Sequence, residues 1–331
     1  MMNIAFASWA FAAAALCAGV MGFAIQRGGT CTVAAVDEVI SSRRFSRITA
    51  LAEASLWVAG GLAIAHALQW PGMAPGAYAV TQWTVVGGVL LGLGAHVNRA
   101  CVFGTIARFG SGEWAYLATP LGFYAGCASV GRLFGHAPAV HVTASSPVLE
   151  AATFSALAFT LFAAWRLARH LPALRSTAAA RKVASRVWSP HAATSVIGIT
   201  FLLMLLLVGN WAYTDALAEL ALAGMSASLA AKLALMLALL AGAWWGGRTA
   251  GRFNSTRIGA ALLARCFTGG LLMGWGSLLI PGGNDGLILA GMPLLRPYAW
   301  LAFGTMCVTI AAALLLARQS SHFHHGRNRG T

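Results

Sequence analysis

Charged residues are scarce in this chain. Of 331 residues only 9% are charged and eight are Asp or Glu, while 59% are hydrophobic. A soluble globular domain carries roughly 25% charged residues, so this composition excludes a water-soluble enzyme of this length and also a disordered chain. Because one bilayer crossing takes roughly 20 apolar residues, most of the chain can lie in lipid. We expect an all-α integral membrane protein.

Several motifs of enzymes and metalloproteins are also missing. None of the six cysteines forms a Cys-x-x-Cys pair, which leaves a thioredoxin-type dithiol or a zinc knuckle unsupported. There is no phosphate-binding loop, so we do not expect this chain to hydrolyse ATP. The sequence predicts a protein that is not an enzyme, with no catalytic residues, no cofactor and no metal.

The net charge of +14 would suggest nucleic-acid binding in a soluble protein. Here the basic residues are dispersed among the short connections between apolar runs, which is the pattern of cytoplasmic loops in membrane proteins. We therefore expect no nucleic-acid partner. The charge indicates topology instead.

Hydropathy predicts about nine transmembrane spans. They are 4–25, 48–69, 79–97, 114–134, 148–168, 191–212, 226–246, 259–280 and 297–317. The first lacks a basic leader and a cleavage site, so we expect it to be retained. With the N-terminus outside, all of the 22 basic residues except Arg132, Lys232 and Arg296 fall on the cytoplasmic side. The positive-inside rule thus predicts an outer N-terminus and a cytoplasmic C-terminus.

Three stretches, 21–31, 91–101 and 273–283, align without gaps. Each has a glycine nine residues before its last position and a small residue three after it. Each begins at the end of a span and continues into an apolar stretch too short to cross the bilayer. Backbone groups freed at membrane depth must line a cavity or be buried in protein. We interpret these stretches as re-entrant half-helices whose N-terminal amides face an anion, although ordinary Gly-rich packing is the bland alternative.

The order of spans and breaks predicts an inverted repeat. Residues 209–215 resemble a degenerate fourth copy, so four spans and two re-entrant pieces stand on each side of the fifth span. A single transmembrane helix between two such halves gives the second half the opposite orientation in the membrane. The predicted divisions are a first half (1–147), a connecting span with a basic linker (148–190), an inverted second half (191–317) and a cytoplasmic tail (318–331).

Two cysteines stand out because Cys31 and Cys101 both occupy the last position of an aligned stretch. A thiol with a reference pKa near ~8.5 is mostly neutral at pH 7, so it can offer S–H to an anion without repelling it. The other four cysteines lie within apolar spans, where a thiol usually behaves as a small buried hydrophobe.

The remaining candidates are polar residues at the breaks and inside the spans. Asn284 and Asp285 follow Gly283 in the third break, and the first two breaks are flanked by Arg27, Asn98 and Arg99. The two arginines either attract an anion or anchor the inner interface. Ionisable groups within spans are functional candidates by default; these are Glu53 and Lys232, and Glu53 could equally pair with an interfacial arginine.

The segments GFAIQRGGTCTVAAV, NRACVFGTIARFGSGEWAYL and GGLLMGWGSLLIPGGNDGLILAGMPLL resemble the sulphur-transport (YeeE/YedE) family of bacterial membrane proteins. The resemblance covers nearly the whole chain. It implies a polytopic inner-membrane carrier for thiosulfate or a related small sulphur anion. It also implies that Cys31 and Cys101 are relay thiols along a central path, and that a cytoplasmic sulphur-carrier protein is a plausible partner.

One departure from the family pattern concerns the third break. Many members carry a third cysteine in a Gly-Cys-Asn motif, whereas Gly283 stands at that position here. Three alternatives therefore remain open. The first is transport of another small anion or of a sulphur or selenium species, the second is a membrane thiol redox or sulphur-relay protein, and the third is a structural subunit without a path.

Overall fold

The computed structural model describes residues 9–70, 74–135, 140–143, 145–174, 187–223, 226–251 and 253–327. Within these residues the chain is helical, with one isolated bridge between Tyr78 and His141. This confirms the all-α class. Parts of the predicted first span, of the 148–190 linker and of the 318–331 tail lie outside the described residues.

Within the described residues, nine longer helices coincide with the nine apolar runs of the sequence. They are α1 (Trp9–Gly28), α3 (Ser46–Ala67), α4 (Gln82–Asn98), α6 (Ala118–Leu133), α8 (Ala152–Leu174), α10 (Pro190–Val208), α12 (Ala227–Thr249), α13 (Ala260–Leu279) and α15 (Pro297–Arg327). Within the described part of the chain, seven helical segments are long and apolar enough to cross a membrane. The 16-residue α6 and the helix α8 are not among them. The protein is therefore a multi-pass membrane protein, while nine crossings remain a prediction.

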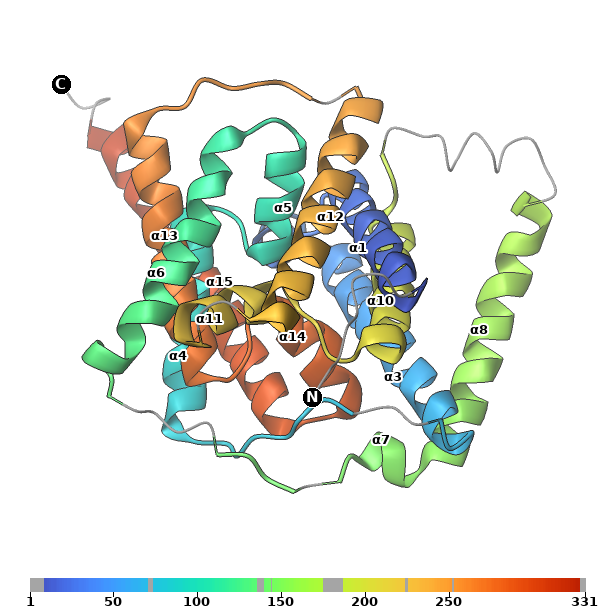
Figure 1. The fold of residues 1–331 in the computed structure, drawn as a ribbon. Helices are drawn as coiled ribbons and strands as arrows, with labels where there is room; N and C mark the ends of the chain where they lie inside the picture. The colour runs from blue at the N-terminus through green and yellow to red at the C-terminus, as the bar shows by residue number, and fades with distance from the viewer. Residues whose placement is uncertain are drawn as a thin grey trace.

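Four shorter helical stretches follow breaks in the long helices. They are α2 (Thr32–Ser42), α5 (Val102–Gly110), α11 (Tyr213–Ala223), and α14 (Asn284–Gly286) with its continuation through η2 (Leu287–Gly291) and η3 (Met292–Leu294). At ~1.5 Å per residue, an 11-residue helix spans only ~16 Å, about half of a ~30 Å hydrocarbon core. Figure 1 shows α5, α11 and α14 towards the middle of the bundle, with long helices around them. The two minor helices, η1 (Trp114–Leu117) and α7 (Pro147–Glu150), lie in connections.

The helix contacts occur in matched pairs between the first and second parts of the chain. Packing of α1 on α12 is matched by α10 on α3, packing of α13 on α6 by α4 on α15, and packing of α11 on α6 by α2 on α15. Helix α1 also packs on α10, and α4 on α13. Helix α8 packs along α3 and stands at the edge of the bundle in Figure 1.

The glycine at the second position of each aligned stretch permits this close packing. A side chain at Gly22 would overlap the backbone of Leu239 on α12, and a side chain at Gly274 would overlap the backbone of Phe123 on α6. Small residues at such crossings let helix backbones approach, which is how helices associate in lipid. The repeated glycines therefore hold the two parts of the chain together.

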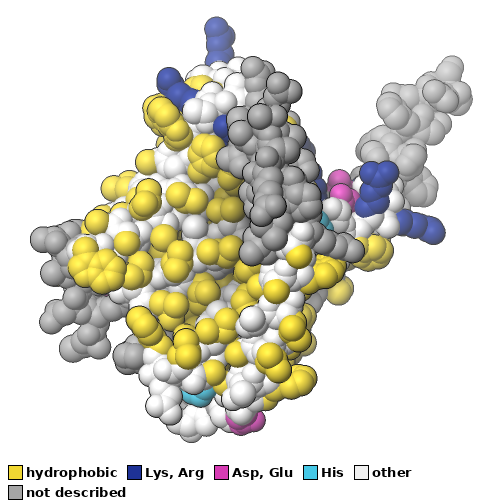
Figure 2. Space-filling model, turned by 90° about the vertical axis from the view of Figure 1, so that its right-hand side faces the viewer, with side chains coloured by type: hydrophobic (Ala, Val, Ile, Leu, Met, Phe, Trp, Pro, Cys, Tyr) yellow, Lys and Arg dark blue, Asp and Glu magenta, His cyan; other side chains and the backbone are white. Residues whose placement is uncertain are grey.

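The outer surface is apolar, as a lipid-facing belt requires. Large hydrophobic side chains such as Leu16, Phe154 and Val308 are about 70% exposed. Figure 2 shows hydrophobic side chains over the middle of one face, and the Lys and Arg side chains visible in that view lie in its upper half. In that view the basic side chains thus lie towards one end of the molecule.

Candidate anion path

The three aligned breaks share one backbone geometry. Each long helix ends in a 6→1 hydrogen bond of the Schellman type. The bonds run from Thr30 N to Ile25 O (3.2 Å), from Ala100 N to Ala95 O (3.0 Å) and from Gly282 N to Ser277 O (2.8 Å). A residue with positive φ precedes each bonded amide: Gly29 at 56°, Arg99 at 57°, and Pro281 in the third break. The long helix ends in the same way in all three breaks.

The next helix also begins equivalently in each case. Cys31, Cys101 and Gly283 are the N-cap residues of α2, α5 and α14, and all three have extended backbones. Their carbonyls accept the first helical hydrogen bonds, from Ala35 (3.0 Å), Thr105 (2.8 Å) and Leu287 (2.9 Å). The aligned sequence positions are therefore structurally equivalent positions, each at the start of a short helix.

A fourth break lies between α10 and α11. Gly209 has a φ of 85°, and Ala216 N–H donates to the carbonyl of Ala212 at 3.2 Å. Ala212 thereby occupies the position that Cys31, Cys101 and Gly283 hold in the other breaks. The fourth copy brings a methyl group to this position instead of a thiol.

The first two breaks meet directly. The backbone N–H of Thr32 donates to Cys101 Sγ at 3.1 Å, and the thiols of Cys31 and Cys101 interact with one another. Gly104 makes room for this contact, since a Cβ there would lie 2.5 Å from Cys31 Sγ. The two thiols predicted from the repeat therefore share one site.

The third and fourth breaks join the same site from the other side. Val102 N–H at the start of α5 donates to Asn284 Oδ1 at 3.3 Å. Asp285 accepts from both groups of Thr214, with Oδ2 3.1 Å from the backbone nitrogen and Oδ1 2.5 Å from Oγ1. We call Thr32, Cys101, Asn284 and Thr214 the waist, because these four polar residues are all fully buried. The waist links the N-terminal ends of α2, α5, α14 and α11.

Two residues of the waist, Thr32 and Asn284, carry a buried polar group without a hydrogen-bond partner among the described residues. Asn284 Nδ2 is buried and has no hydrogen-bond partner among the described residues. A buried donor without an acceptor costs about 1–3 kcal/mol, so its retention at this position needs an explanation. An anion passing through the waist would supply the missing acceptor.

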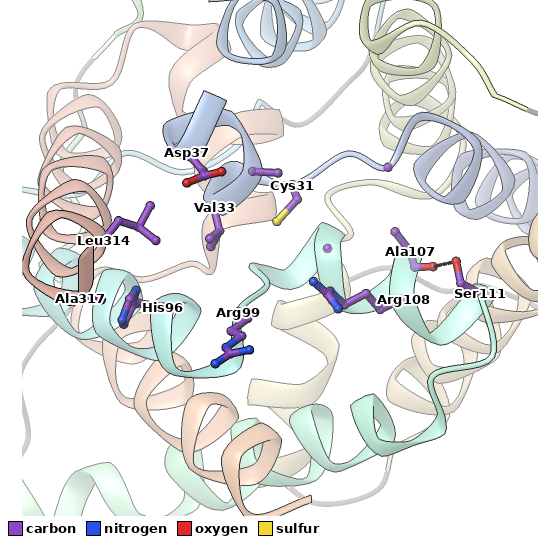
Figure 3. Close-up of a pocket in the computed structure, with 13 residues that line it drawn as sticks. Cys31, Val33, Asp37, His96, Arg99, Ala107, Arg108, Ser111, Leu314 and Ala317 are labelled. Atoms are coloured by element: carbon purple, nitrogen blue, oxygen red, sulfur yellow. Dashed lines mark hydrogen bonds between the residues drawn. The ribbon is translucent and has the colours of Figure 1, made fainter. Parts of the chain in front are cut away.

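A cavity of about 600 Å³, here called the basic cavity, lies on one side of the waist. Cys31 and Gly104 line it together with Arg99 and Arg108, and Asp37 contributes one acidic group. Figure 3 shows the Cys31 sulphur and the side chains of Arg99 and Arg108 around this cavity. Arg108 is also held 3.1 Å from Glu113. The arrangement places a thiol and positive charge around one cavity.

A second cavity of about 210 Å³, here called the acidic cavity, is lined by Asn210, Asp215, Gly282, Gly286 and Tyr78. Burial and the nearby Asp215 carboxylate raise the pKa of Tyr78, so its phenol stays neutral near pH 7 and can donate a hydrogen bond. This cavity therefore combines a carboxyl group with uncharged polar groups, unlike the basic cavity.

The two cavities lie at opposite ends of the bundle. Helix α15 contributes Tyr298 to the acidic cavity and Ala317 to the basic cavity. At ~1.5 Å per residue these positions are ~28 Å apart along the helix, close to the ~30 Å thickness of a hydrocarbon core. The waist separates them.

Two of the expected site residues have other partners. Arg27 is buried at the end of α1, where its Nη2 donates to Thr249 Oγ1 at 2.9 Å, and it lies outside the lining of the basic cavity. Asn98 is fully buried, with Nδ2 2.9 Å from both Ala100 O and Thr105 Oγ1. These two side chains position the breaks, whereas Arg99 lines the cavity.

The two ionisable residues noted within the spans are paired. Glu53 accepts from Arg166 Nε (2.9 Å) and Nη2 (2.6 Å) and contacts His191 Nδ1 at 2.5 Å. This cluster ties α3 to α8 and α10. Lys232 forms an ion pair with Glu219. The interfacial pairing of Glu53 with an arginine, one of the two expectations, is thus observed.

Sequence reasoning missed three residues of this region. Thr214 is part of the waist, Arg108 lines the basic cavity, and Asp215 lines the acidic cavity. The fourth copy of the motif, residues 209–215, contains both Thr214 and Asp215. Its likeness to the other breaks could have marked these two as candidate site residues. Arg108 carries no such mark in the sequence, because its place depends on how α5 packs.

The sulphur-transport family matches residues 27–312 of the chain, a range that includes Cys31, Cys101, Ala212 and Gly283 at the four breaks. No curated protein matches the chain at a significant level. The matched region covers most of the chain, and the chain therefore belongs to the sulphur-transport family of membrane proteins.

Proposed function

We propose that this protein carries thiosulfate, or a similar small sulphur-containing anion, into the cytoplasm across a bacterial inner membrane. The anion passes from the acidic cavity through the waist to the basic cavity. The protein performs no covalent chemistry on it in this proposal. A cytoplasmic sulphur-carrier protein would then receive the anion.

The proposal includes nine crossings, an outer N-terminus and two inverted halves. The matched contacts support the inverted halves, because the packing of α1 on α12 has its counterpart in α10 on α3. The presence of four breaks, two in each half, supports it further. Transporters built from inverted repeats place their site near the midplane, where broken helices meet.

The observation that carries the function is the pair of thiols at two helix N-termini, those of α2 and α5. Cys31 borders the basic cavity and Cys101 is buried in the waist beside it. A helix N-terminus carries a partial positive charge that favours an anion, and a neutral thiol adds a weak donor without holding the anion tightly. Weak successive contacts suit passage, because an anion must leave as readily as it enters.

The charges support a direction for the path. The positive-inside rule assigns the basic cavity to the cytoplasmic side. Arg99 and Arg108 there would attract the anion out of the waist. Gly29 and Cys31, which line the same cavity at the end of α1, would border the way of the anion.

Labelled uptake tests the proposal in cells that lack other thiosulfate importers. We expect the wild-type chain to restore uptake, and the double variant Cys31→Ala/Cys101→Ala to lose most of it. The matched control is Cys17→Ala/Cys127→Ala, which removes two thiols from long helices away from the waist. Uptake that survives loss of both waist thiols would contradict the relay, and absence of uptake by the wild type would contradict the substrate.

Competition in the same assay identifies the substrate class. An unlabelled anion that shares the path reduces thiosulfate uptake, so sulphite, sulphate, selenite and polysulphide are the informative competitors. A competitor that is itself taken up faster than thiosulfate would replace it as the proposed substrate.

The contact between Cys31 and Cys101 also favours a second candidate, a membrane thiol relay. Here the two thiols would form a disulfide and deliver two electrons and two protons to an external oxidant such as a quinone or a disulfide. A thiol relay predicts that quinone reduction by the purified protein depends on both thiols. Transport predicts that uptake continues in the presence of a thiol reductant.

A further inference from the structure

The third break lacks a thiol because another side chain fills the space. A Cβ on Gly283 would lie 2.7 Å from both Cβ and Cγ2 of Thr214, which is fully buried. The backbone of Gly283 is extended, with a φ of −75°, so the conformation itself would accept a side chain. Thr214 of α11 therefore brings a hydroxyl to the place where the first two breaks carry Cys31 and Cys101.

The partners of Thr214 decide whether that hydroxyl can bind an anion. Both Asp285 oxygens accept from Thr214, one from the backbone N–H and one from the hydroxyl. An ionised carboxylate only accepts hydrogen bonds, so the single proton of the Thr214 hydroxyl is committed to Asp285. An arriving anion then meets oxygen lone pairs and a negative charge, and both repel it.

Protonation of Asp285 reverses this arrangement. A protonated carboxyl has an O–H that can donate to Thr214 Oγ1, which frees the proton of the Thr214 hydroxyl to point at an anion. Protonation also removes the negative charge of Asp285, which lies next to the waist. The adjacent Asn284 Nδ2, buried and without a partner among the described residues, is a second donor for the same anion.

We propose that Asp285 and Thr214 form a proton-operated gate, in which the anion occupies the third break only while Asp285 holds a proton. The proton comes from water in the acidic cavity and returns there, and no covalent bond to the anion forms. This inference rests on the proposed function and adds its regulation.

Several ionisable groups surround the gate. They are Tyr213, Asp215 and Glu219 on α11, the Lys232 partner of Glu219 on α12, Tyr78 and Tyr298 in the acidic cavity, and Cys101 and Arg108 at the two ends of α5. Asp215 matters most among them, because it lies next to the residue that follows Asp285. A Cβ built on Gly286 would be 3.9 Å from Asp215 Oδ1. A negative charge on Asp215 would favour a proton on Asp285.

The test uses the full chain in liposomes with labelled thiosulfate outside and the outer pH varied between 6 and 8. We expect wild-type uptake to rise as the outer pH falls, by up to about tenfold per pH unit while the protonated fraction is small. In Asp285→Asn the amide donates to Thr214 Oγ1 as a protonated carboxyl would, so uptake should persist and become independent of pH. Glu150→Gln, an exposed acid on α7 far from the waist, is the matched control and should keep the wild-type pH profile.

The hydroxyl is tested by an isosteric pair. Thr214→Val retains the shape and loses the donor, and we expect about a tenfold or greater loss of uptake at every pH. Thr214→Ser retains the donor and should keep both uptake and pH dependence. Size-exclusion elution and melting temperature show that each variant is folded before uptake is compared.

The outcomes separate the two proposals. Uptake that is present but insensitive to outer pH, or a pH dependence that persists in Asp285→Asn, overturns the gate and leaves the transport function standing. A pH dependence lost in Asp215→Asn and kept in Asp285→Asn assigns the proton to Asp215 and overturns the gate as stated. Absence of thiosulfate uptake at every pH overturns the transport function together with the gate.

Discussion

The backbone N–H of Thr32 donates to Cys101 Sγ at 3.1 Å, across 69 positions of the chain. This contact joins the start of α2 to the residue that caps α5. Because a sulphur atom is a weak acceptor, an anion at the same amide would form a stronger bond than the thiol does. The contact is therefore a structural link between the two short helices.

The Gly104→Ala variant tests how tightly α2 and α5 meet. Its new Cβ would lie 2.5 Å from Cys31 Sγ and 3.1 Å from Cys31 Cβ, and overpacking of this kind costs about 1–3 kcal/mol. We expect a lower melting temperature and reduced uptake. Adding Cys31→Ala should recover part of the melting temperature because it removes the overlapping sulphur. No recovery in the double variant would contradict the contact.

The Gly283→Ala variant tests whether Thr214 fills the third break. We expect a destabilisation of about 1–3 kcal/mol from overlap with Thr214, measured as a fall in melting temperature. Gly304→Ala on α15 is the matched control, since a Cβ there meets open space. Thr214→Gly combined with Gly283→Cys should fold better than Gly283→Cys alone. Equal melting temperatures for Gly283→Ala and Gly304→Ala would exclude this packing.

Thiol labelling tests the cavities and the proposed orientation. Cys31 lines the basic cavity, whereas Cys101 is fully buried. In chains that keep one of these thiols, a charged water-soluble reagent should label Cys31 in inside-out vesicles much faster than Cys101. Faster labelling of Cys31 from the outer face of intact cells would reverse the orientation.

The Glu53 cluster predicts a structural effect. Its side chain is 10% exposed and pairs with Arg166, so removing one partner of this partly buried pair should cost more than the ~1 kcal/mol of an exposed pair. We expect Glu53→Gln to lower the melting temperature clearly. Asp37→Asn breaks the half-exposed pair with Arg318 and should change stability by less than about 1 kcal/mol. Similar effects of the two variants would contradict a stabilising role for the cluster.

The class of protein and the positions of its breaks could be predicted from the sequence. With 9% charged residues the chain cannot form a water-facing surface, so its surface must face lipid. The apolar runs predict the positions of the long helices. The spacing of Gly22 to Cys31 recurs in Gly92 to Cys101, and local backbone chemistry produces the same Schellman ending in both. Such features depend on neighbours along the chain, so the sequence carries them.

The pairing of the breaks could not be predicted, because it depends on contacts between distant segments. Arg27 and Arg99 both flank a break in the sequence, yet Arg27 bonds to Thr249 while Arg99 lines the basic cavity. The direction of each side chain follows from the rotation of its helix in the bundle. Sequence spacing does not determine that rotation.

The third break shows the division most clearly. The sequence alone determines that Gly283 has no thiol. Only the tertiary structure decides what stands there instead, because packing of α11 against α14 places Thr214 in the free space and Asp285 on its hydroxyl. A glycine leaves room for any neighbour, and the fold selects which neighbour fills it.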